Sequence, residues 1–521
     1  MTLTAPSSWH WGRLLVEPRR PQAIRGRGDA HWFAVAAVCV GALMGQLDAS
    51  IVTVALPSLT RSFHASVGSV TWVGLAYLVT LVATVTAVGR FADMFGRKLL
   101  YIYGFLIFIA ASALCGLAPD LAALVGFRAL QGLGAAMLQA NSLAIIVLVV
   151  PARALGRALG LQAAAQAIGL ALGPTVGGVL LAAGGWRLIF LVNVPLGLFG
   201  AAAALALVPR SQNLQARAPF DWLGLGLFFP GVVALLSALS FGATAGWGSP
   251  LVLALLTTAA ALGVAFWAVE RRSGRGDDGT GQRRLGDRTR QRRRVGPMLD
   301  LALFRITHFA TGIVSGLGAY LVLFGVLLLI PFYLERGLGL GAARSGLELM
   351  ALPLAFGLAA SLAGRWVDRV GPRSLTTGGM ALAATSLLLL GLIRPGSGTL
   401  LVLLVLLGGV GAGLGLFTSP NNAAIMGAVP PQQAGVASGV LNMSRGLGTA
   451  LGLAVTGLVF TVTGGATAPH VAAAAHVASA VVNHAFSVTA FVLAGIALGS
   501  GCLAALRANG ALGDARLAAI E

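Results

Sequence analysis

The sequence predicts an all-α integral membrane protein with fourteen transmembrane helices. Of its 521 residues, 57% are apolar and only 10% are charged, whereas soluble domains carry about 25% charged residues. The apolar residues form long runs, and about 20 such residues in a helix cross the roughly 30 Å hydrocarbon layer of a membrane. The runs exceed the roughly 10 residues of a barrel strand and lack its alternation of apolar and polar residues. A soluble enzyme is therefore excluded.

The expected spans fall into three sets along the chain. A first set of six precedes a pair of additional spans, and a polar gap separates this pair from a second set of six. In chain order the expected spans are 31–57, 70–90, 99–118, 121–149, 158–183, 187–208, then 220–241 and 249–269, then 307–334, 346–366, 374–393, 399–427, 436–462 and 484–507.

The charge distribution predicts how the chain is oriented. The net charge of +19 is typical of nucleic-acid binders, but the arginines fall mainly in alternate loops and in both terminal segments. Five precede the first span, and ten lie between Arg271 and Arg294. Loops rich in Lys and Arg stay in the cytoplasm. We therefore expect a multi-pass protein of the cytoplasmic (inner) membrane with both termini cytoplasmic, and no nucleic-acid partner.

The domain plan follows from these spans and loops. The polar stretch 271–300 combines ten arginines with four aspartates, a local charge of +6, and is interpreted as a flexible cytosolic linker resting near anionic lipid headgroups. A nucleic-acid-binding arm is the alternative. The expected segments are a basic cytosolic arm (1–30), a six-helix bundle (31–208), two inserted helices (220–270), a basic linker (271–305), a second six-helix bundle (306–507) and a cytosolic tail (508–521).

Several kinds of chemistry are not indicated. Lys98 is the only lysine and precedes Leu99, so the Gly-Lys-Ser/Thr of a P-loop ATP site is missing. The three cysteines occur singly in apolar stretches, which argues against disulfides and thiolate metal sites. No catalytic constellation is discernible. We therefore expect no enzyme activity, no metal and no cofactor.

A ten-residue pattern occurs twice, at equivalent places in the two sets of six spans. Residues 89–98 read Gly-Arg-Phe-Ala-Asp-Met-Phe-Gly-Arg-Lys, and residues 364–373 read Gly-Arg-Trp-Val-Asp-Arg-Val-Gly-Pro-Arg. Each closes the second span of its set on the expected cytosolic side. Such parallel repeats of six spans indicate a transporter that rocks about a site between its halves. The candidate gating residues are Gly89, Arg90, Asp93, Gly96, Arg97 and Lys98, with Gly364, Arg365, Asp368, Gly371 and Arg373 in the repeat.

The first of these decapeptides resembles the loop motif between spans two and three of the major facilitator superfamily. The fourteen-span layout is similar to the drug:proton antiporter branch of that superfamily, of the QacA/EmrB type. The resemblance runs from about residue 31 to 507. Four further stretches resemble motifs of this branch in spans one, four and five and at the start of span six: residues 47–57, 128–134, 169–178 and 186–197.

The resemblance implies a major facilitator fold of two six-helix bundles plus two inserted helices. It implies a proton-coupled antiporter that exports drugs or other small toxic or secondary-metabolite molecules by rocking alternating access. The expected partners are a small-molecule substrate, protons and the lipid bilayer, and the chain is expected to be a monomer energised by the proton gradient. A dedicated exporter or importer of one metabolite is the alternative within this class. A membrane scaffold or membrane enzyme is the alternative outside it.

Two ionisable residues deep in predicted spans are the candidates for proton coupling. Ionisable groups inside a membrane are costly and are functional candidates for that reason. Asp48 and Arg128 fall at matching depths, roughly 20 Å from the inner edge by helical rise, so they can pair. Gln131 lies one helical turn from Arg128. A purely structural ion pair is the alternative. Arg445, in span thirteen, is a further candidate for which structural and functional roles are equally open.

Small residues in the fifth span form the other candidate motif. Gly169, Gly173 and Gly177 recur every four residues on one helix face, a spacing that lets helices approach closely. Pro174 removes one backbone hydrogen bond, and Gly178 completes the motif. The resemblance associates this face with antiporters and with sealing the pathway against leak.

Overall fold

A computed structural model describes residues 17, 20–25, 27–65, 67–211, 221–274, 301–340, 342–393, 399–430, 433–464 and 475–506. Every regular element that these residues form is helical, and fourteen helices are long and apolar enough to cross a membrane. The predicted all-helical fold with fourteen spans is confirmed. Most of the expected arm, all of the linker between 275 and 300 and the tail lie outside the described residues.

The helices preceding the long linker begin with α1 (Gln22–Arg25), a single turn. The first long helices are α2 (Ala30–Phe63), α3 (Val67–Phe95), α4 (Arg97–Gly116), α5 (Leu121–Val149), α6 (Leu155–Gly184), α7 (Trp186–Leu191) and α8 (Asn193–Leu207). Two further helices follow, α9 (Trp222–Ala245) and α10 (Pro250–Gly274).

The helices after the linker are α11 (Thr307–Phe332), α12 (Ala342–Leu349), α13 (Ala351–Val370), α14 (Pro372–Gly391), α15 (Thr399–Gly427), α16 (Ala434–Val462) and α17 (Ala475–Ala505). Two short turns, Leu301–Arg305 and Tyr333–Gly337, precede and follow α11.

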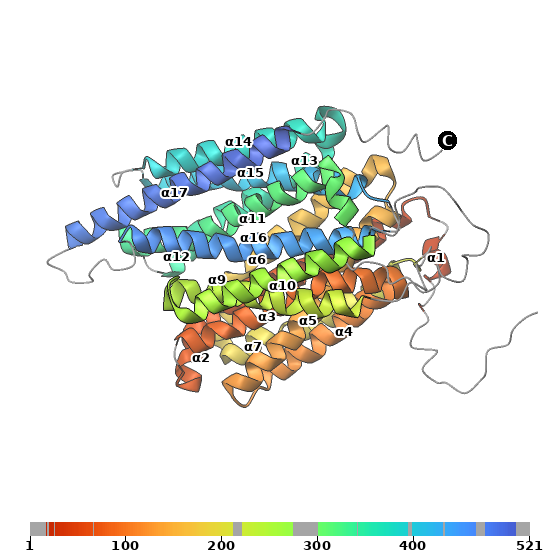
Figure 1. The fold of residues 1–521 in the computed structure, drawn as a ribbon, viewed down its shortest axis with the longest axis horizontal. Coiled ribbons are helices and arrows are strands. Elements are labelled where there is room, and N and C mark those ends of the chain that lie inside the picture. Colours follow the sequence, from red (N-terminus) through yellow and green to blue (C-terminus); the bar gives the residue numbers. More distant parts are fainter. Residues whose placement is uncertain are drawn as a thin grey trace, which may run out of the picture.

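The long helices pack as two groups. In the first group, α2–α8, helix α2 packs on α6 and helix α5 packs on α3 and α4. In the second group, α11–α17, helix α15 packs on α13 and α14, and α11 packs on α16. Helices α9 and α10 pair with each other, and α9 contacts both α3 and α16, so the additional pair lies along the seam between the groups (Figure 1).

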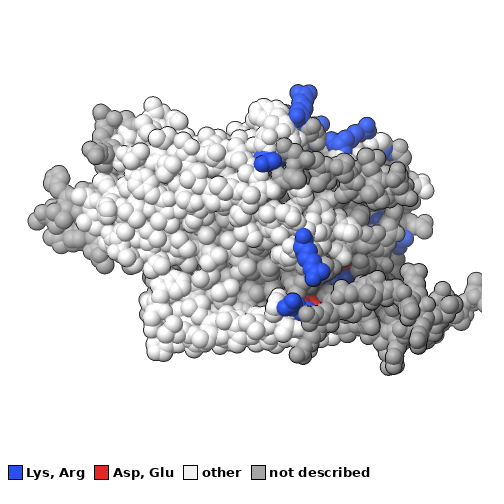
Figure 2. Space-filling view, turned by 45° about the horizontal axis from the view of Figure 1, so that its top comes forward, with Lys and Arg blue, Asp and Glu red and all other residues white. Residues whose placement is uncertain are grey.

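The outer surface of the bundle is apolar. Large apolar side chains such as Leu358, Leu401 and Val405 are 71%, 69% and 65% exposed. An apolar surface of this extent is not found facing water, whereas it is stable against lipid. Figure 2 shows the described Lys and Arg residues gathered toward one end of the molecule, with the rest of the visible face uncharged. We call this the basic end; α3 ends and α4 begins there.

The structure differs from the expected span boundaries at two informative places. The sixth span, expected as one helix over 187–208, consists of α7 and α8, which meet at Val192. A single polar residue, Asn193, follows the break within an otherwise apolar run, so hydropathy averaged over the run does not register it. The tenth span, expected as one helix over 346–366, consists of the short helix α12 and of α13, which begins at Ala351 and continues to Val370.

The helices continue through most of each repeated decapeptide, beyond the expected span ends at residues 90 and 366. Residues 89–95 are the last two turns of α3, and Arg97 already begins α4, so Gly96 alone connects the two helices. Gly96 has a φ of +114° and Gly371, its counterpart between α13 and α14, a φ of +83°. Side chains other than glycine rarely adopt such angles, which explains why both copies carry glycine there.

Candidate functional site

A buried polar cluster surrounds Asp48 on α2. Its side chain is fully buried, and its two carboxylate oxygens accept three hydrogen bonds. Oδ2 accepts from Arg128 Nη1 at 2.7 Å, and Oδ1 accepts from Gln131 Nε2 at 3.0 Å and Asn193 Nδ2 at 2.7 Å. The structure therefore brings together the Asp48, Arg128 and Gln131 that the sequence singled out, and it adds Asn193 from the first position of α8.

Arg128 on α5 is held from several sides. Its side chain is 1% exposed, and its Nε donates to the carbonyl oxygen of Val73 at 2.9 Å. Its guanidinium lies over the ring of Tyr77, 4.3 Å from the ring centre, and Nη1 also donates to Gln131 Oε1 at 2.6 Å. Because a buried ion pair is tolerated only when its remaining polar atoms are bonded, these contacts explain how two charges persist here.

The cluster links three helices through one carboxylate. Asp48 is on α2, Arg128 and Gln131 are on α5, and Asn193 begins α8 just after the break at Val192. Protonation of the carboxylate would remove its charge and with it the ion pair to Arg128. The arrangement is therefore able to convert the binding of one proton into a change in how α2 and α5 contact each other.

A second polar region, not predicted from the sequence, lies between the two groups of helices. A small cavity there is lined by Gln46 of α2, Gln139 of α5, Gln162 and Gln166 of α6, and Asn442 of α16. Asn442 Nδ2 donates to the carbonyl oxygen of Gln139 at 3.0 Å, which joins the second group to the first. The signal in the sequence was the pair of glutamines four residues apart in an otherwise apolar span. Helical spacing alone did not show that this face points inward.

Arg445 lies one turn from this cavity. Its side chain is buried, its Nη1 donates to Asn442 Oδ1 at 3.2 Å, and its guanidinium lies 5.2 Å from the ring centre of Tyr320 on α11. It therefore positions an amide that lines the cavity, while the Asp48 cluster is built from other residues.

At the basic end, Asp93 joins the two groups of helices. Its Oδ1 accepts from the backbone N–H of Gly435 at 3.2 Å and its Oδ2 from that of Val436 at 3.3 Å, in the first turn of α16. Arg97 Nη2 donates to the same carboxylate at 2.5 Å. A carboxylate at a helix N-terminus is favoured by the helix dipole and by the unbonded N–H groups there.

Glycines of the two decapeptides permit equivalent close contacts between the groups. A Cβ atom at Gly89 of α3 would clash with the carbonyl oxygen of Gly435 of α16, and one at Gly364 of α13 would clash with that of Gly156 of α6. The basic end is thus closed by two backbone-to-backbone crossings related by the repeat.

The remaining residues of the decapeptides differ in their surroundings. Arg90 and Lys98 are buried, and Lys98 Nζ donates to the carbonyl oxygen of Leu205 at 2.8 Å. In the second copy, Arg365 is exposed and Arg373 half-buried. The side chain of Asp368 lies outside the described part of the structure, so the equivalence with Asp93 stays a prediction.

The glycines of α6 serve different purposes. Gly169 faces the backbone of α2 at Leu43, and Gly173 faces Ser50 of the same helix so closely that a Cβ would clash. Gly177 is buried, and Pro174 lies within the continuous helix. A Cβ at Gly178 would meet open space, so close helix packing does not explain that glycine.

Comparison with known proteins identifies the family. Residues 38–244 and 220–453 match the family profile of the Major Facilitator Superfamily. The chain belongs to this superfamily. Its members are transporters, so this protein is a multi-pass membrane transporter and not an enzyme.

Similar superfamily members carry resistance and transport names. The chain is 35% identical over 421 residues to "Multidrug resistance protein Stp" of Mycobacterium tuberculosis, covering 81% of this chain and 74% of the relative. It is 30% identical over 423 residues to "Riboflavin transporter RibZ" of Clostridioides difficile, covering 81% and 87%. It is 30% identical over 438 residues to the "Tetracenomycin C resistance and export protein" of Streptomyces glaucescens, covering 84% and 76%.

A solved transporter structure has a similar fold. The crystal structure of the human organic anion transporter MFSD10 (TETRAN) aligns with a TM-score of 0.62 over 91% of this chain and 99% of that one, at 16% sequence identity. The fold of two helix groups is therefore that of the Major Facilitator Superfamily.

Replacing Asp93 by asparagine should loosen the basic end of this transporter. The change removes a charged acceptor from the N-terminus of α16, and hydrogen bonds to charged groups contribute about 1.5–3 kcal/mol. We expect roughly tenfold or greater exposure of the buried Ser438, measured as maleimide labelling of a Ser438→Cys reporter in a Cys502→Ser background.

The matched control is Asp29→Asn, which removes an exposed carboxylate of the same end. Its labelling should equal that of the parent reporter. Unchanged labelling in the Asp93→Asn variant would contradict the assignment of Asp93 as the contact that holds this end closed.

Proposed function

We propose that the protein is a proton-coupled antiporter that exports drugs or other small toxic or secondary-metabolite molecules. It works in the cytoplasmic membrane with both termini in the cytoplasm, so the basic end faces the cytoplasm. The positive charge of that end supports the orientation. The observation that carries the proposal is the fully buried Asp48 carboxylate bound to Arg128 in the interior of a membrane-spanning helix group.

The coupling step is a proton exchange at Asp48. With the carboxylate ionised, Arg128 Nη1 and Gln131 Nε2 hold it against α5. A proton arriving from the outside neutralises the carboxylate, and the pair with Arg128 separates. Gln46 lies on α2 with Asp48, and Gln139 lies on α5 with Arg128, so a change in the spacing of these helices reshapes the wall of the amide-lined cavity.

Alternating access then requires the two ends to open in turn. The crossings at Gly89 with Gly435 and at Gly364 with Gly156 close the basic end in this structure. Release of Asp93 from the first turn of α16 opens the cavity to the cytoplasm, where substrate enters. The proton leaves Asp48 in that state, and the ion pair re-forms as the basic end closes.

The amide-lined cavity holds only about 10 Å³ while the basic end is closed, so opening of that end must enlarge it before a substrate fits. Its lining favours neutral substrates with several hydrogen-bonding groups. The residues that line it contribute five side-chain amides and no carboxylate. An amide both donates and accepts, so it bonds hydroxyl and carbonyl groups of varied molecules. This chemistry suits drug-like secondary metabolites better than permanent cations.

A dedicated transporter of a single metabolite is the second candidate, because one relative is named a riboflavin transporter. The two candidates differ in breadth. A broad exporter lowers the accumulation of several unrelated probes, whereas a dedicated transporter acts on one.

Expression in an efflux-deficient bacterial host tests the proposal. We expect lowered accumulation of tetracenomycin C and of at least one further probe among riboflavin and ethidium, and loss of this effect on adding a protonophore. Lowered accumulation that survives the protonophore would contradict proton coupling, and action on riboflavin alone would favour the dedicated transporter.

Replacing Gln166 by leucine should change which probes are exported. The change removes one donor and one acceptor from the cavity while keeping the side chain's size. We expect a fourfold or larger shift in the relative resistance to the probes, with protonophore sensitivity retained. Leu172→Ala, at a lipid-exposed position of the same helix, is the control. An equal loss for every probe would show that Gln166 serves the fold and not selectivity.

A further inference from the structure

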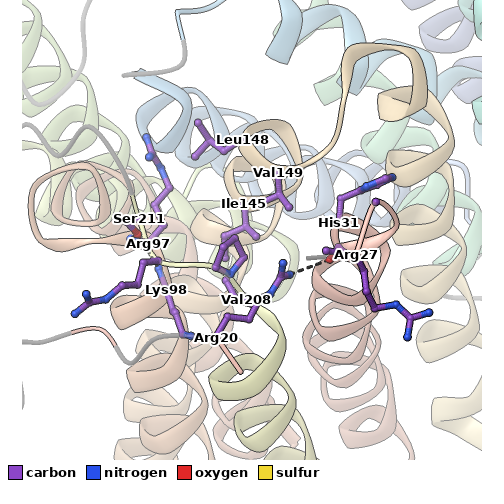
Figure 3. Close-up of a pocket in the computed structure, with 14 residues that line it drawn as sticks. Arg20, Arg27, His31, Arg97, Lys98, Ile145, Leu148, Val149, Val208 and Ser211 are labelled. Atoms are coloured by element: carbon purple, nitrogen blue, oxygen red, sulfur yellow. Dashed lines mark hydrogen bonds between the residues drawn. The ribbon is translucent and has the colours of Figure 1, made fainter. Parts of the chain in front are cut away.

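A cavity of about 470 Å³ opens at the basic end, away from the amide-lined cavity. Figure 3 shows that four parts of the chain surround it: the segment before α2, the start of α4, the last turn of α5 and the residues after α8. Arg20 lies between Arg97 and Lys98 on one side and Arg27 and His31 on the other (Figure 3).

The ionisable side chains that line this cavity are all basic: Arg20, Arg27, His31, Arg97, Lys98 and Arg210. Acidic groups nearby do not cancel them. Asp29 pairs with Arg27, and Asp93 pairs with Arg97, while the Glu17 carboxylate is bonded to backbone N–H groups of Leu99 and Ser211. Four arginines and Lys98 thus face three carboxylates, which leaves the cavity cationic.

Arg20 and Arg210 are fixed in place by hydrogen bonds to backbone carbonyl groups. Arg20 donates to the carbonyl oxygens of Leu207 and Ala30, and Arg210 Nε donates to that of Glu17 at 2.5 Å. These bonds tie the segment before α2 to the end of α8. Retention of positive loops in the cytoplasm explains the charges but not their convergence from distant segments on one hollow. A preorganised set of donors binds an anion without first losing side-chain freedom.

One wall of the same cavity is apolar. Ile145, Leu148 and Val149 from the end of α5 and Val208 after α8 line it, and Leu148 is 41% exposed. These residues lie at the ends of membrane-spanning helices. A small soluble anion gains nothing from such a wall, whereas a phospholipid presents a phosphate and acyl chains side by side.

We propose that this cavity binds the phosphate of an anionic phospholipid from the adjoining leaflet, with Arg20, Arg27, Lys98 and Arg210 around the headgroup and the acyl chains along the α5 wall. Basic pockets between transmembrane helices are suited to such headgroups. The bound lipid bridges the segment before α2 to the start of α4, next to the Asp93 contact. The site is independent of which substrate the transporter exports.

Titration of the purified full chain in detergent tests the site. The probes are short-chain phosphatidylglycerol, phosphatidylcholine with the same chains, and inorganic phosphate, with heat of binding as the signal. We expect phosphatidylglycerol to bind at least tenfold more tightly than either of the others. Equal affinity for phosphatidylcholine would overturn the proposal, and equal affinity for inorganic phosphate would make the site one for a soluble anion and overturn the lipid assignment.

A pair of double variants locates the binding. Arg27→Gln with Arg210→Gln removes two exposed charges of the cavity, and Arg153→Gln with Arg369→Gln removes two exposed arginines outside it. The first pair should weaken phosphatidylglycerol binding about tenfold and the second less than twofold. Equal weakening by both pairs would show attraction by the whole basic end and overturn the site.

The melting temperature of each double variant without lipid should match that of the parent protein, which excludes unfolding as the cause of weaker binding. The single variant Arg27→Gln is a second test, because this side chain is 57% exposed and pairs with the exposed Asp29. It should weaken phosphatidylglycerol binding about threefold. No effect of this variant on phosphatidylglycerol affinity would count against the headgroup position.

Discussion

Replacing Asp48 by asparagine is expected to reduce proton-gradient-driven transport at least 100-fold. Asparagine has the shape of the protonated side chain but cannot release a proton, so the exchange step at the Arg128 pair is lost. The measurement is uptake of the best-exported probe into proteoliposomes under an imposed pH gradient. Counterflow of the same probe without a gradient should remain within a few-fold of the parent, because it needs no proton release.

The control for this experiment is Asp120→Asn. Asp120 caps the N-terminus of α5 at its exposed end, accepting from the N–H of Ala123 at 2.8 Å, and asparagine caps helices equally well. This variant should transport normally. If Asp48→Asn lowered driven uptake and counterflow by the same factor, Asp48 would be a structural partner of Arg128 and no more.

Replacing Arg128 by methionine is expected to destabilise the protein strongly. The change leaves the fully buried Asp48 carboxylate without its counter-charge, and breaking a buried ion pair from one side costs about 3–5 kcal/mol. The melting temperature of the purified protein in detergent should fall, and yield with it.

The double variant Asp48→Asn with Arg128→Met should recover part of this stability, since no unpaired carboxylate is then buried. The coupling energy from this double-mutant cycle measures the interaction between Asp48 and Arg128. Additive losses in the two single variants would contradict the direct interaction between these side chains. Transport should stay absent in the double variant, which separates stability from coupling.

The spans were predictable because runs of about 20 apolar residues can be recognised in the sequence without knowing how the helices pack. The sequence also predicted the depth of Asp48 and Arg128, since helical rise is constant. The helical rise gives the depth of a residue in the membrane, but it does not show in which direction the side chain points. Asn193 was missed as a site residue for that reason, although Asn193 and Pro195 are residue types favoured at helix starts and could have indicated the break at Val192.

The amide-lined cavity and the Asp93 contact show a second limit. Gln166 and Asn442 are far apart in the chain and meet only when the two helix groups pack. The sequence named Asp93 as a candidate gating residue, but its partner, the first turn of α16, depends on tertiary packing. The decapeptides resemble a loop motif of the family, and the expected spans ended at residues 90 and 366. Their helical geometry follows from α3 continuing to Phe95.

The central claim, that substrate binding is coupled to release of a proton from Asp48, is tested most directly by measuring that proton release. The purified full chain in weakly buffered detergent solution is titrated with a probe whose binding has been established, and a pH dye records the response. We predict proton release that saturates with the probe and is absent in the Asp48→Asn variant. Binding of the probe without any release of protons, or equal release from the Asp48→Asn variant, would contradict it.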